Sequence, residues 1–284
     1  MYHTLSSLWI ELLRKGLAED GHPWDWTTLG IVHGSIQAHV LAKSDGVWAA
    51  ETLTQSLDSV FPGVQAQSLV KDGVRFKKGD VLVQLKGSTD SLLALERPFL
   101  NLAAYVSGIA TATEQMVQVV KKACPARTPR VTLTRKTLPG YRDLAIHGVR
   151  CGGGHPHRVS LSGGVLIKEN HIAAAGGIAK AVAAARGVAP HGLKVEIEVR
   201  NQSELEHALA ASAEVIMLDN FSPNQVRDAV KFVSAHPRRL LLEVSGGLSL
   251  NTIGEYAIAG VDVLSVGSLT HSVQCVDLSF LVDE

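Results

Sequence analysis

The sequence contains few cysteines and few aromatic residues. Of its 284 residues, three are cysteine, at positions 124, 151 and 275, and 5% are aromatic. So few cysteines, unevenly spaced, argue against a disulfide framework. Hydrophobic residues still make up 46% of the chain, so Ala, Val, Leu and Ile must build most of the core. This composition is typical of buried parallel strands covered by helices, and we expect an α/β fold.

An excess of charge and a long apolar run are also missing. The 27 Lys and Arg residues balance 27 Asp and Glu residues, so no overall field favours nucleic acid or a membrane surface. No stretch approaches the length of a membrane span, and Glu11, Arg14 and Lys15 interrupt the apolar positions near the N-terminus, unlike a secretion signal. We therefore expect a soluble, cytoplasmic protein whose anion-binding groups are local.

The first part of the chain has an α+β pattern. Apolar residues at helical spacing predict a helix over 4–18, and alternation from Ser35 onward predicts short strands separated by Asp-Gly and Lys-Gly turns up to about residue 88. A long helix is expected from Ser91 to Lys122, followed by a linker over 125–129.

After this linker, apolar strands alternate with helical segments, which predicts parallel βα units. The expected strands end at Lys168, Val199, Asp219, Val244 and Val266. An Ala-rich helix is expected over 173–186. Ser203 with Glu206 predicts a capping box, and Ser222 followed by Pro223 predicts another helix start. This spacing suits a barrel or a doubly wound sheet and does not choose between them.

Charged residues lie where these strands end. They are Arg135, Lys136, Lys168, Glu198, Asp219 and Glu243. Ligands of parallel α/β folds gather at the carboxyl ends of the strands, and buried charge is costly unless it is paired or bound to a ligand. The collective pattern favours a polar substrate site over a salt-bridge network, although each residue alone fits either interpretation.

Two glycine turns suggest a phosphate site. Ser245, Gly246 and Gly247 follow one strand, and Gly267 and Ser268 follow the next. Glycine lets backbone N–H groups approach a phosphate, although either turn alone could simply be a tight βα connection. The motifs GxxxxGK[ST] and GxGxxG are missing, which argues against triphosphate and dinucleotide folds.

The segment from Arg150 to Arg158 contains Cys151, His155 and His157, which could suggest a metal site. It lacks a second ligand pair at zinc spacing, so we favour a loop that presents His157 and Arg158 to an anion. His155 could equally be a structural histidine. Lys168 also permits a Schiff-base lyase, but the nearby cations equally suit a substrate with several carboxylates or phosphates.

Eight ordered motifs resemble the quinolinate phosphoribosyltransferase family. They are ERPFLNLAAYVSGIAT (96–111), TRKTLPGYR (134–142), GGGHPHR (152–158), LIKENHI (166–172), VEIEV (195–199), IMLDNF (216–221), EVSGG (243–247) and SVGSLTHS (265–272). The resemblance covers nearly the whole chain. It implies an N-terminal α/β sandwich over 1–110, an incomplete α/β barrel over 111–269, and a C-terminal segment, 270–284, that packs back on the first domain.

The resemblance also implies the activity and the roles of the site residues. Quinolinate would react with phosphoribosyl pyrophosphate in a homodimer, and Arg97 would reach into the neighbouring subunit's site. Quinolinate would be held by Arg135, His157, Arg158 and Lys168. Phosphoribosyl pyrophosphate would be held by Lys136, Glu198, Asp219, Ser245, Gly246, Gly247, Gly267 and Ser268. Lys136, Lys168, Glu198 and Asp219 would be catalytic, with Mg²⁺ at Glu198 and Asp219 as cofactor.

The chain departs from the family pattern around its His-Arg pair. Pro156 stands where the family usually has Asn, the segment 159–164 contains a glycine where an aspartate is expected, and Glu169 replaces the usual aspartate after Lys168. Rival hypotheses are a relative with another pyridine specificity, the Schiff-base lyase, and a catalytically silent phosphate-binding subunit.

Overall fold

The computed structural model describes residues 5–30 and 34–283, and these residues form two compact units. Unit 1 comprises the chain up to Glu114, the segment Asp143–Gly153 and the chain from Val273 onward. Unit 2 comprises Gln115–Arg142 and Gly154–Ser272. The long helix α4 (Thr89–Ala123) therefore contributes to both units. It continues through Pro98 as a single helix.

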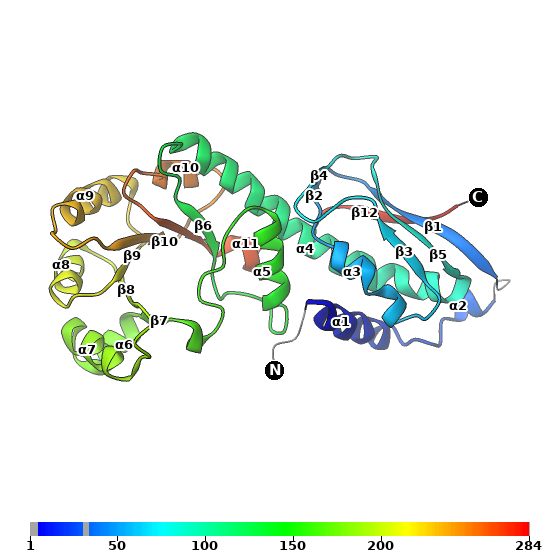
Figure 1. Ribbon diagram of the computed structural model, residues 1–284, viewed down its shortest axis with the longest axis horizontal. Coiled ribbons are helices and arrows are strands. Elements are labelled where there is room, and N and C mark those ends of the chain that lie inside the picture. The colour runs from blue at the N-terminus through cyan, green and yellow to red at the C-terminus, as the bar shows by residue number, and fades with distance from the viewer. Residues whose placement is uncertain (1–4, 31–33, 284) are drawn as a thin grey trace. The chain divides into compact units, whose positions relative to one another are not determined.

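Unit 1 is built on an antiparallel sheet of four strands in the order β12-β1-β5-β3 (Figure 1). The strands are β1 (Ser35–Ala42), β3 (Gln65–Ser68), β5 (Val81–Ser88) and β12 (Leu278–Val282), and a small pair is formed by β2 (Gly46–Val47) and β4 (Arg75–Phe76). Ala38, Val40 and Ala42 alternate into the core from β1. The pairing of β12 with β1 returns the C-terminal segment to the first sheet.

The helices of unit 1 are α1 (Leu5–Glu19), α2 (Trp26–Leu29), α3 (Glu51–Gln55), the short η1 (Leu57–Ser59), α5 (Arg142–Cys151) and the first part of α4. The predicted first helix is confirmed for its described residues; residue 4 lies outside them. Trp9 and Leu13 of α1 are fully buried, and Gly16 lets α1 approach Pro98 of α4 closely. Burial of these large side chains holds the helices together.

Unit 2 contains a parallel sheet of six strands in the order β6-β11-β10-β9-β8-β7. They are β6 (Arg130–Leu133), β7 (Val165–Ile167), β8 (Val195–Val199), β9 (Val215–Asp219), β10 (Leu241–Ser245) and β11 (Val263–Val266). The edge strands β6 and β7 are not joined in this sheet. The predicted fold class, an N-terminal α/β unit with an incomplete α/β barrel, is confirmed.

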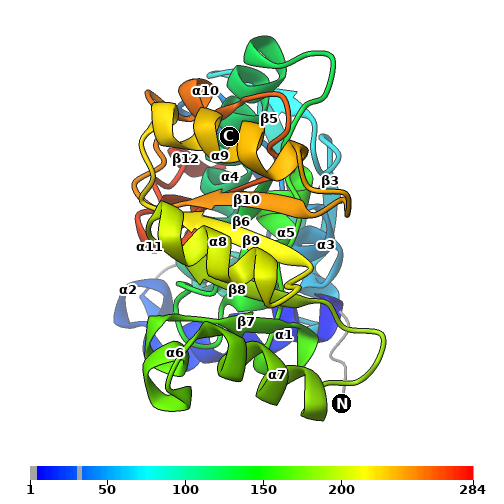
Figure 2. The same ribbon diagram turned by 90° about the vertical axis from the view of Figure 1, so that its left-hand side faces the viewer.

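The outer face of this sheet is covered by α7, α8 and α9, which Figure 2 shows in front of the strands. The helices of unit 2 are α6 (Glu169–Ala175), α7 (Ile178–Val188), α8 (Gln202–Ala210), α9 (Pro223–Ser234), α10 (Ile253–Tyr256) and α11 (Ser268–His271), with a short η2 (Leu161–Gly163). Their apolar residues pack on the sheet, which leaves the strand ends free for a site.

Two local predictions in unit 2 are wrong and one is confirmed. The Ala-rich helix is split into α6 and α7, because Gly176 and Gly177 have φ values of +76° and +129°, which end the first helix. The predicted Ser203–Glu206 capping box does not form; Asn201 caps α8 by accepting a hydrogen bond from the Glu204 N–H. The predicted N-cap Ser222 forms a capping box with Gln225.

None of the helices in the described part of the chain has both the length and the apolar stretch needed to cross a membrane.

Candidate active site

A cavity of about 560 Å³ lies at the carboxyl ends of the parallel strands, and its walls belong to unit 2 alone. The lining includes ten of the residues predicted for the site: Arg135, Lys136, His157, Arg158, Lys168, Glu198, Asp219, Ser245, Gly246 and Gly247. The parallel strands bring these residues together because their carboxyl ends lie at the same edge of the sheet.

His157 is held between two buried carboxylates in this cavity. Its Nε2 lies 3.2 Å from Oε2 of Glu243 and 3.3 Å from Oε2 of Glu196. Burial disfavours the charged imidazole, but the hydrogen bonds and charges of Glu196 and Glu243 outweigh burial and raise the pKa of His157 to about 10. Burial raises the pKa of Glu196 in turn. His157 is therefore positively charged at neutral pH.

A chain of hydrogen bonds through Ser265 and Thr132 fixes the Glu243 carboxylate. The Ser265 hydroxyl donates to Oε1 of Glu243 at 2.5 Å, and the hydroxyls of Thr132 and Ser265 are 2.7 Å apart. Glu243 is 2% exposed, so these bonds satisfy a carboxylate that has little access to water. The chain links β6, β11 and β10 to the imidazole and sets its orientation.

Two arginines lie near the cluster of His157, Glu196 and Glu243. Burial and the neighbouring charge of Arg135 lower the pKa of Arg158. The buried Nε of Arg135 has no hydrogen-bond partner within 5–30 and 34–283, and the same holds for Oε1 of Glu196. Unsatisfied polar atoms of this kind are expensive unless a ligand or water completes them. The arginine side of the cavity is thus suited to an anion.

A second group of charges lies at the ends of β7, β8 and β9. The Lys168 ammonium donates to Oε2 of Glu198 at 2.8 Å, and the Asn220 side-chain amide donates to Oδ2 of Asp219 at 2.8 Å. Glu198 is buried, whereas Lys168 is half-exposed. Because these four residues come from strand ends, the sheet itself sets their spacing.

The first glycine turn packs against Asn220. Gly246 has a φ of +95°, and a Cβ at this position would lie 2.3 Å from Oδ1 of Asn220. The Asn220 N–H donates to the carbonyl oxygen of Ser245 at 2.9 Å. Gly246 is therefore required by both conformation and space, whereas a Cβ on Gly247 would meet no described atom within 4 Å.

Three predicted site residues do not line this cavity. Gly267 lies beside Lys136 and His271, and the buried Oγ of Ser268 has no partner in the described part of the chain. Thr270 donates to the carbonyl oxygen of Lys136 at 2.9 Å. Arg97 lies on α4 in unit 1, where its side chain is 62% exposed and 3.5 Å from Glu96.

The segment in which the sequence departs from the family pattern is held by two arginines. Arg158 Nη1 donates to the carbonyl oxygen of Gly164 at 3.2 Å, and Arg142 Nη1 donates to that of Val159 at 3.1 Å. The N–H of His155 donates to the carbonyl oxygen of Val131 at 2.8 Å, which ties the start of the segment to β6. Cys151 belongs to unit 1, whereas His155 and His157 belong to unit 2.

Sequence reasoning missed Glu196, Ser265 and Asn220 as site residues, and left Glu243 without a role. Glu196 was detectable, because it lies two positions before Glu198 and side chains at this spacing share one face of a strand. Ser265 and Thr132 gave no signal, because their importance depends on pairing between strands that are distant in the sequence.

Comparison with known proteins supports the motif-based assignment. The model of the quinolinate phosphoribosyl transferase N-terminal domain matches residues 25–107, and that of the C-terminal domain matches 109–281. A probable nicotinate-nucleotide pyrophosphorylase [carboxylating] of Bacillus subtilis is 38% identical over 271 residues, covering 95% of this chain and 91% of the relative. The nicotinate-nucleotide pyrophosphorylase [carboxylating] of Homo sapiens is 34% identical over 270 residues, covering 94% and 89%.

The solved structure of the nicotinate-nucleotide pyrophosphorylase from Francisella tularensis superposes with a TM-score of 0.90 at 35% identity. The match covers 99% of this chain and 98% of that chain. Both domain models, the relatives and the architecture thus agree over nearly the full length. The chain belongs to the quinolinate phosphoribosyl transferase family.

Proposed function

We propose that this protein is a carboxylating nicotinate-nucleotide pyrophosphorylase, which transfers the phosphoribosyl group of phosphoribosyl pyrophosphate to quinolinate. The products would be nicotinate mononucleotide, pyrophosphate and CO₂, on the route to NAD. The observation that carries the proposal is the cavity at the strand ends, which combines five cationic side chains with three carboxylates and a glycine turn.

The pyridine dicarboxylate would bind at the arginine side of the cavity. Arg135 and Arg158 can each form paired hydrogen bonds with a carboxylate, and the protonated His157 adds a third positive charge. Lys168 would lie between the two substrates. The unpartnered Nε of Arg135 supports this role, since a ligand carboxylate would complete it.

The phosphoribosyl group would bind over β8, β9 and β10. The turn at Gly246 and Gly247 lets backbone N–H groups face a phosphate, and Ser245 adds a hydroxyl. Glu198 and Asp219 would contact the ribose hydroxyls. Lys136, whose carbonyl oxygen accepts a hydrogen bond from the Thr270 hydroxyl, would contact the pyrophosphate. Gly267 and Ser268, in the turn beside Lys136, would contribute to binding of the 5′-phosphate.

The donor set at the ends of β8 and β9 fits Mg²⁺. Glu198 and Asp219 supply hard carboxylate oxygens in the same cavity, and Mg²⁺ is usually held by one or two carboxylates together with phosphate oxygens. A Mg²⁺ ion bound there would offset the charge of the departing pyrophosphate.

The reaction needs alignment and charge stabilisation more than proton transfer. The pyridine nitrogen attacks the anomeric carbon of ribose while the bond to pyrophosphate breaks. The carboxylate beside that nitrogen then leaves as CO₂. The electron pair of the broken bond stays on the ring carbon, where the neighbouring positive nitrogen stabilises it, until that carbon takes up a proton. Arg135 and Arg158 would hold the ring in line, and Lys136 would stabilise the leaving group.

We further propose a homodimer in which Arg97 of each chain enters the site of its partner. The exposure of the Arg97 side chain on α4 and its place in the ERPFL motif support this. We also propose a cytoplasmic location, which the three free cysteines support.

The decisive experiment supplies phosphoribosyl pyrophosphate and Mg²⁺ with either quinolinate or nicotinate and follows mononucleotide and CO₂. We expect product and CO₂ from quinolinate alone. Product from nicotinate alone would refute the dicarboxylate assignment. Lack of product from either compound, in folded dimeric protein, would favour the non-catalytic hypothesis.

A Schiff-base lyase gains no support from the surroundings of Lys168. A Schiff-base lysine must be a neutral amine, which proteins obtain in apolar surroundings or next to another cation. Lys168 instead donates to the carboxylate of Glu198 at 2.8 Å. Borohydride trapping with a carbonyl substrate should therefore leave Lys168 unmodified.

A further inference from the structure

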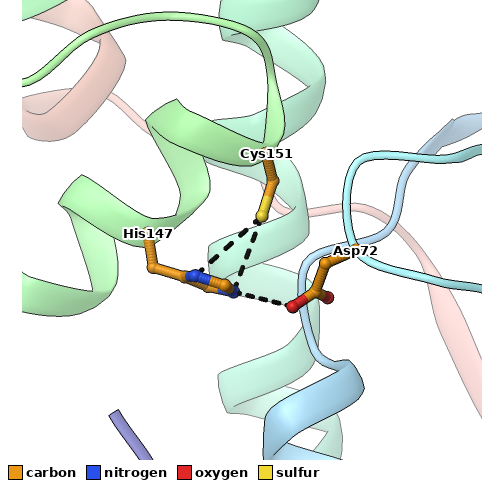
Figure 3. Close-up of side chains that lie close together, drawn as sticks. All are labelled: Asp72, His147 and Cys151. Atoms are coloured by element: carbon orange, nitrogen blue, oxygen red, sulfur yellow. Dashed lines mark hydrogen bonds and ion pairs between the residues drawn. The ribbon is translucent and has the colours of Figure 1, made fainter. Parts of the chain in front are cut away.

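Unit 1 contains a cluster of metal-ligating side chains outside the proposed active site. It consists of Asp72, in the loop between β3 and β4, and of His147 and Cys151 on α5 (Figure 3). One ligand atom from each residue lies within 4.8 Å of the other two. All three residues are half-buried, so an ion could reach them from solvent.

The donor atoms converge on a single nitrogen. Nε2 of His147 lies 3.2 Å from Oδ2 of Asp72, 3.6 Å from Sγ of Cys151 and 3.0 Å from the carbonyl oxygen of Ala49. A ring nitrogen carries at most one hydrogen, which cannot satisfy three acceptors in different directions. A cation bound by the ring nitrogen, the carboxylate and the sulfur would remove this competition.

The two distances from Nε2 to its side-chain neighbours are close to those between ligand atoms of a tetrahedral zinc site. Bonds of about 2.0–2.3 Å from Zn²⁺ to nitrogen, oxygen and sulfur place neighbouring ligand atoms roughly 3.3–3.6 Å apart. The distances from Nε2, 3.2 Å to the carboxylate oxygen and 3.6 Å to sulfur, are close to these values. Zn²⁺ also accepts this mixture of thiolate, imidazole and carboxylate ligands.

We propose that Asp72, His147 and Cys151 bind a divalent transition-metal ion, with Zn²⁺ as the expected occupant.

The surroundings of the cluster orient its ligands as an outer shell does around a metal. Oδ1 of Asp72 accepts a hydrogen bond from the Glu51 N–H at 2.9 Å, and the Asp72 N–H donates to Oε2 of Glu51 at 3.1 Å. His147 and Cys151 are four positions apart on α5, so they share one helix face. The ring of Trp9 packs edge-on against that of His147.

A nucleophilic cysteine of the Cys-His-Asp kind would need a different arrangement. In such a triad, the carboxylate holds one ring nitrogen and the thiol faces the other. Here the carboxylate is bonded to Nε2, which is also the nitrogen nearer to sulfur, at 3.6 Å compared with 4.0 Å for Nδ1. The geometry therefore favours shared coordination over proton relay.

A bound ion would join two segments of unit 1 that are about 75 positions apart in the sequence, the loop between β3 and β4 and helix α5. Because these donors are brought together only in the folded chain, binding of the ion should stabilise unit 1 through mass action.

The experiment titrates metal-stripped, reduced protein with Co²⁺ and records near-ultraviolet absorption from thiolate coordination, followed by displacement with Zn²⁺. We expect this band in the natural sequence and its loss in Cys151→Ser. His147→Gln and Asp72→Asn should weaken Zn²⁺ binding by at least about tenfold. Cys275→Ser, which changes an exposed cysteine of unit 1, is the matched control and should retain the band.

Absence of the band from the natural sequence, or its persistence in Cys151→Ser, would overturn the proposal. Alkylation of the unaltered protein provides a test that needs no folded variant. Saturating Zn²⁺ should slow alkylation of Cys151 at least about tenfold and leave Cys275 unaffected. Equal rates for Cys151 with and without Zn²⁺ would also overturn it. Neither measurement depends on catalytic activity.

Discussion

The two units each contain a histidine whose Nε2 faces two acidic groups. In unit 2, His157 lies between Glu196 and Glu243, and in unit 1, His147 lies beside Asp72 and Cys151. Burial opposes the charged form of both rings, but their acidic neighbours raise the pKa of each to about 10. The protonation of the ring alone therefore does not distinguish their roles.

The two histidines differ in the side chains that contact Nε2 and in the residues around those side chains. The partners of His157 are two buried carboxylates on parallel strands, beside Arg135 and Arg158 in a cavity. Those of His147 include a thiol, which adds a soft ligand that favours Zn²⁺. A charged histidine among other cations suits anion binding, whereas a histidine among convergent oxygen and sulfur donors suits a metal, which takes the place of the ring proton.

Removing an arginine beside His157 should have the largest effect. Arg158→Ala and Arg135→Ala should each lower kcat/KM for quinolinate by roughly 10- to 100-fold, because a hydrogen bond to a charged group contributes about 1.5–3 kcal/mol. Steady-state kinetics would measure this, with thermal unfolding to check the fold. Arg14→Ala, in α1 of unit 1, is the control and should keep normal kinetics. Unchanged kinetics in Arg158→Ala would refute the carboxylate assignment.

Each cluster also has a neighbouring glycine with positive φ, and the two differ in available space. Gly246→Ala should destabilise the protein by at least about 2 kcal/mol, because its Cβ would overlap Asn220 at 2.3 Å as well as strain the backbone. Gly73→Ala should destabilise the protein by only about 1 kcal/mol. The atom nearest to its Cβ would be the Cys151 carbonyl oxygen, at 3.2 Å, so there is less overlap than at Gly246. Urea unfolding would compare them, and equal costs would contradict the close packing at Asn220.

Neutralising one carboxylate in each cluster should lower the pKa of the histidine in that cluster and leave the other histidine unchanged. Glu196→Gln should lower the pKa of His157, and Asp72→Asn that of His147, each by about one unit or more, because an opposite charge is lost. Imidazole NMR titration would resolve both rings. A shift of His157 in Asp72→Asn, or of His147 in Glu196→Gln, would show that the clusters are not independent.

The same pKa values set the direction of the pH dependence. Both histidines are raised above the ordinary value of 6.5, so their contribution to stability is complete below pH 6.5 and is lost as the pH rises through about 10. The midpoint of thermal unfolding of the metal-free protein should therefore fall over this range. Replacing both histidines with Gln should flatten the decline, and an unaltered slope would contradict the assigned protonation.

Much of the architecture was predictable because its signals are local. Buried parallel strands are short apolar runs, so the predicted ends at Asp219 and Val266 coincide with those of β9 and β11. The capping residue of α8 was not predictable with the same certainty. Asn201 and Ser203 are both good N-cap residues, and only the path of the chain out of β8 decides between them.

The candidate site was predictable as a collection of strand-end charges, but its internal contacts were not. Lys168 and Glu198 were both expected at strand ends, yet their 2.8 Å contact depends on the pairing of β7 with β8. The sequence places Cys151 near His155 and His157. Its contacts in the folded chain are instead with His147, one helical turn earlier, and His147 in turn contacts Asp72, which lies in another part of the sequence.

The sequence by itself determined the family, the α/β class and the order of charged residues along the chain, because motifs and apolar periodicity are encoded in neighbouring residues. Only the tertiary structure decided which of these charged groups contact one another, which polar atoms lack a hydrogen-bond partner in the described residues, and that Asp72 contacts a residue of α5. Such contacts join residues tens of positions apart, and the distances that set their energies arise only when strands and helices pack.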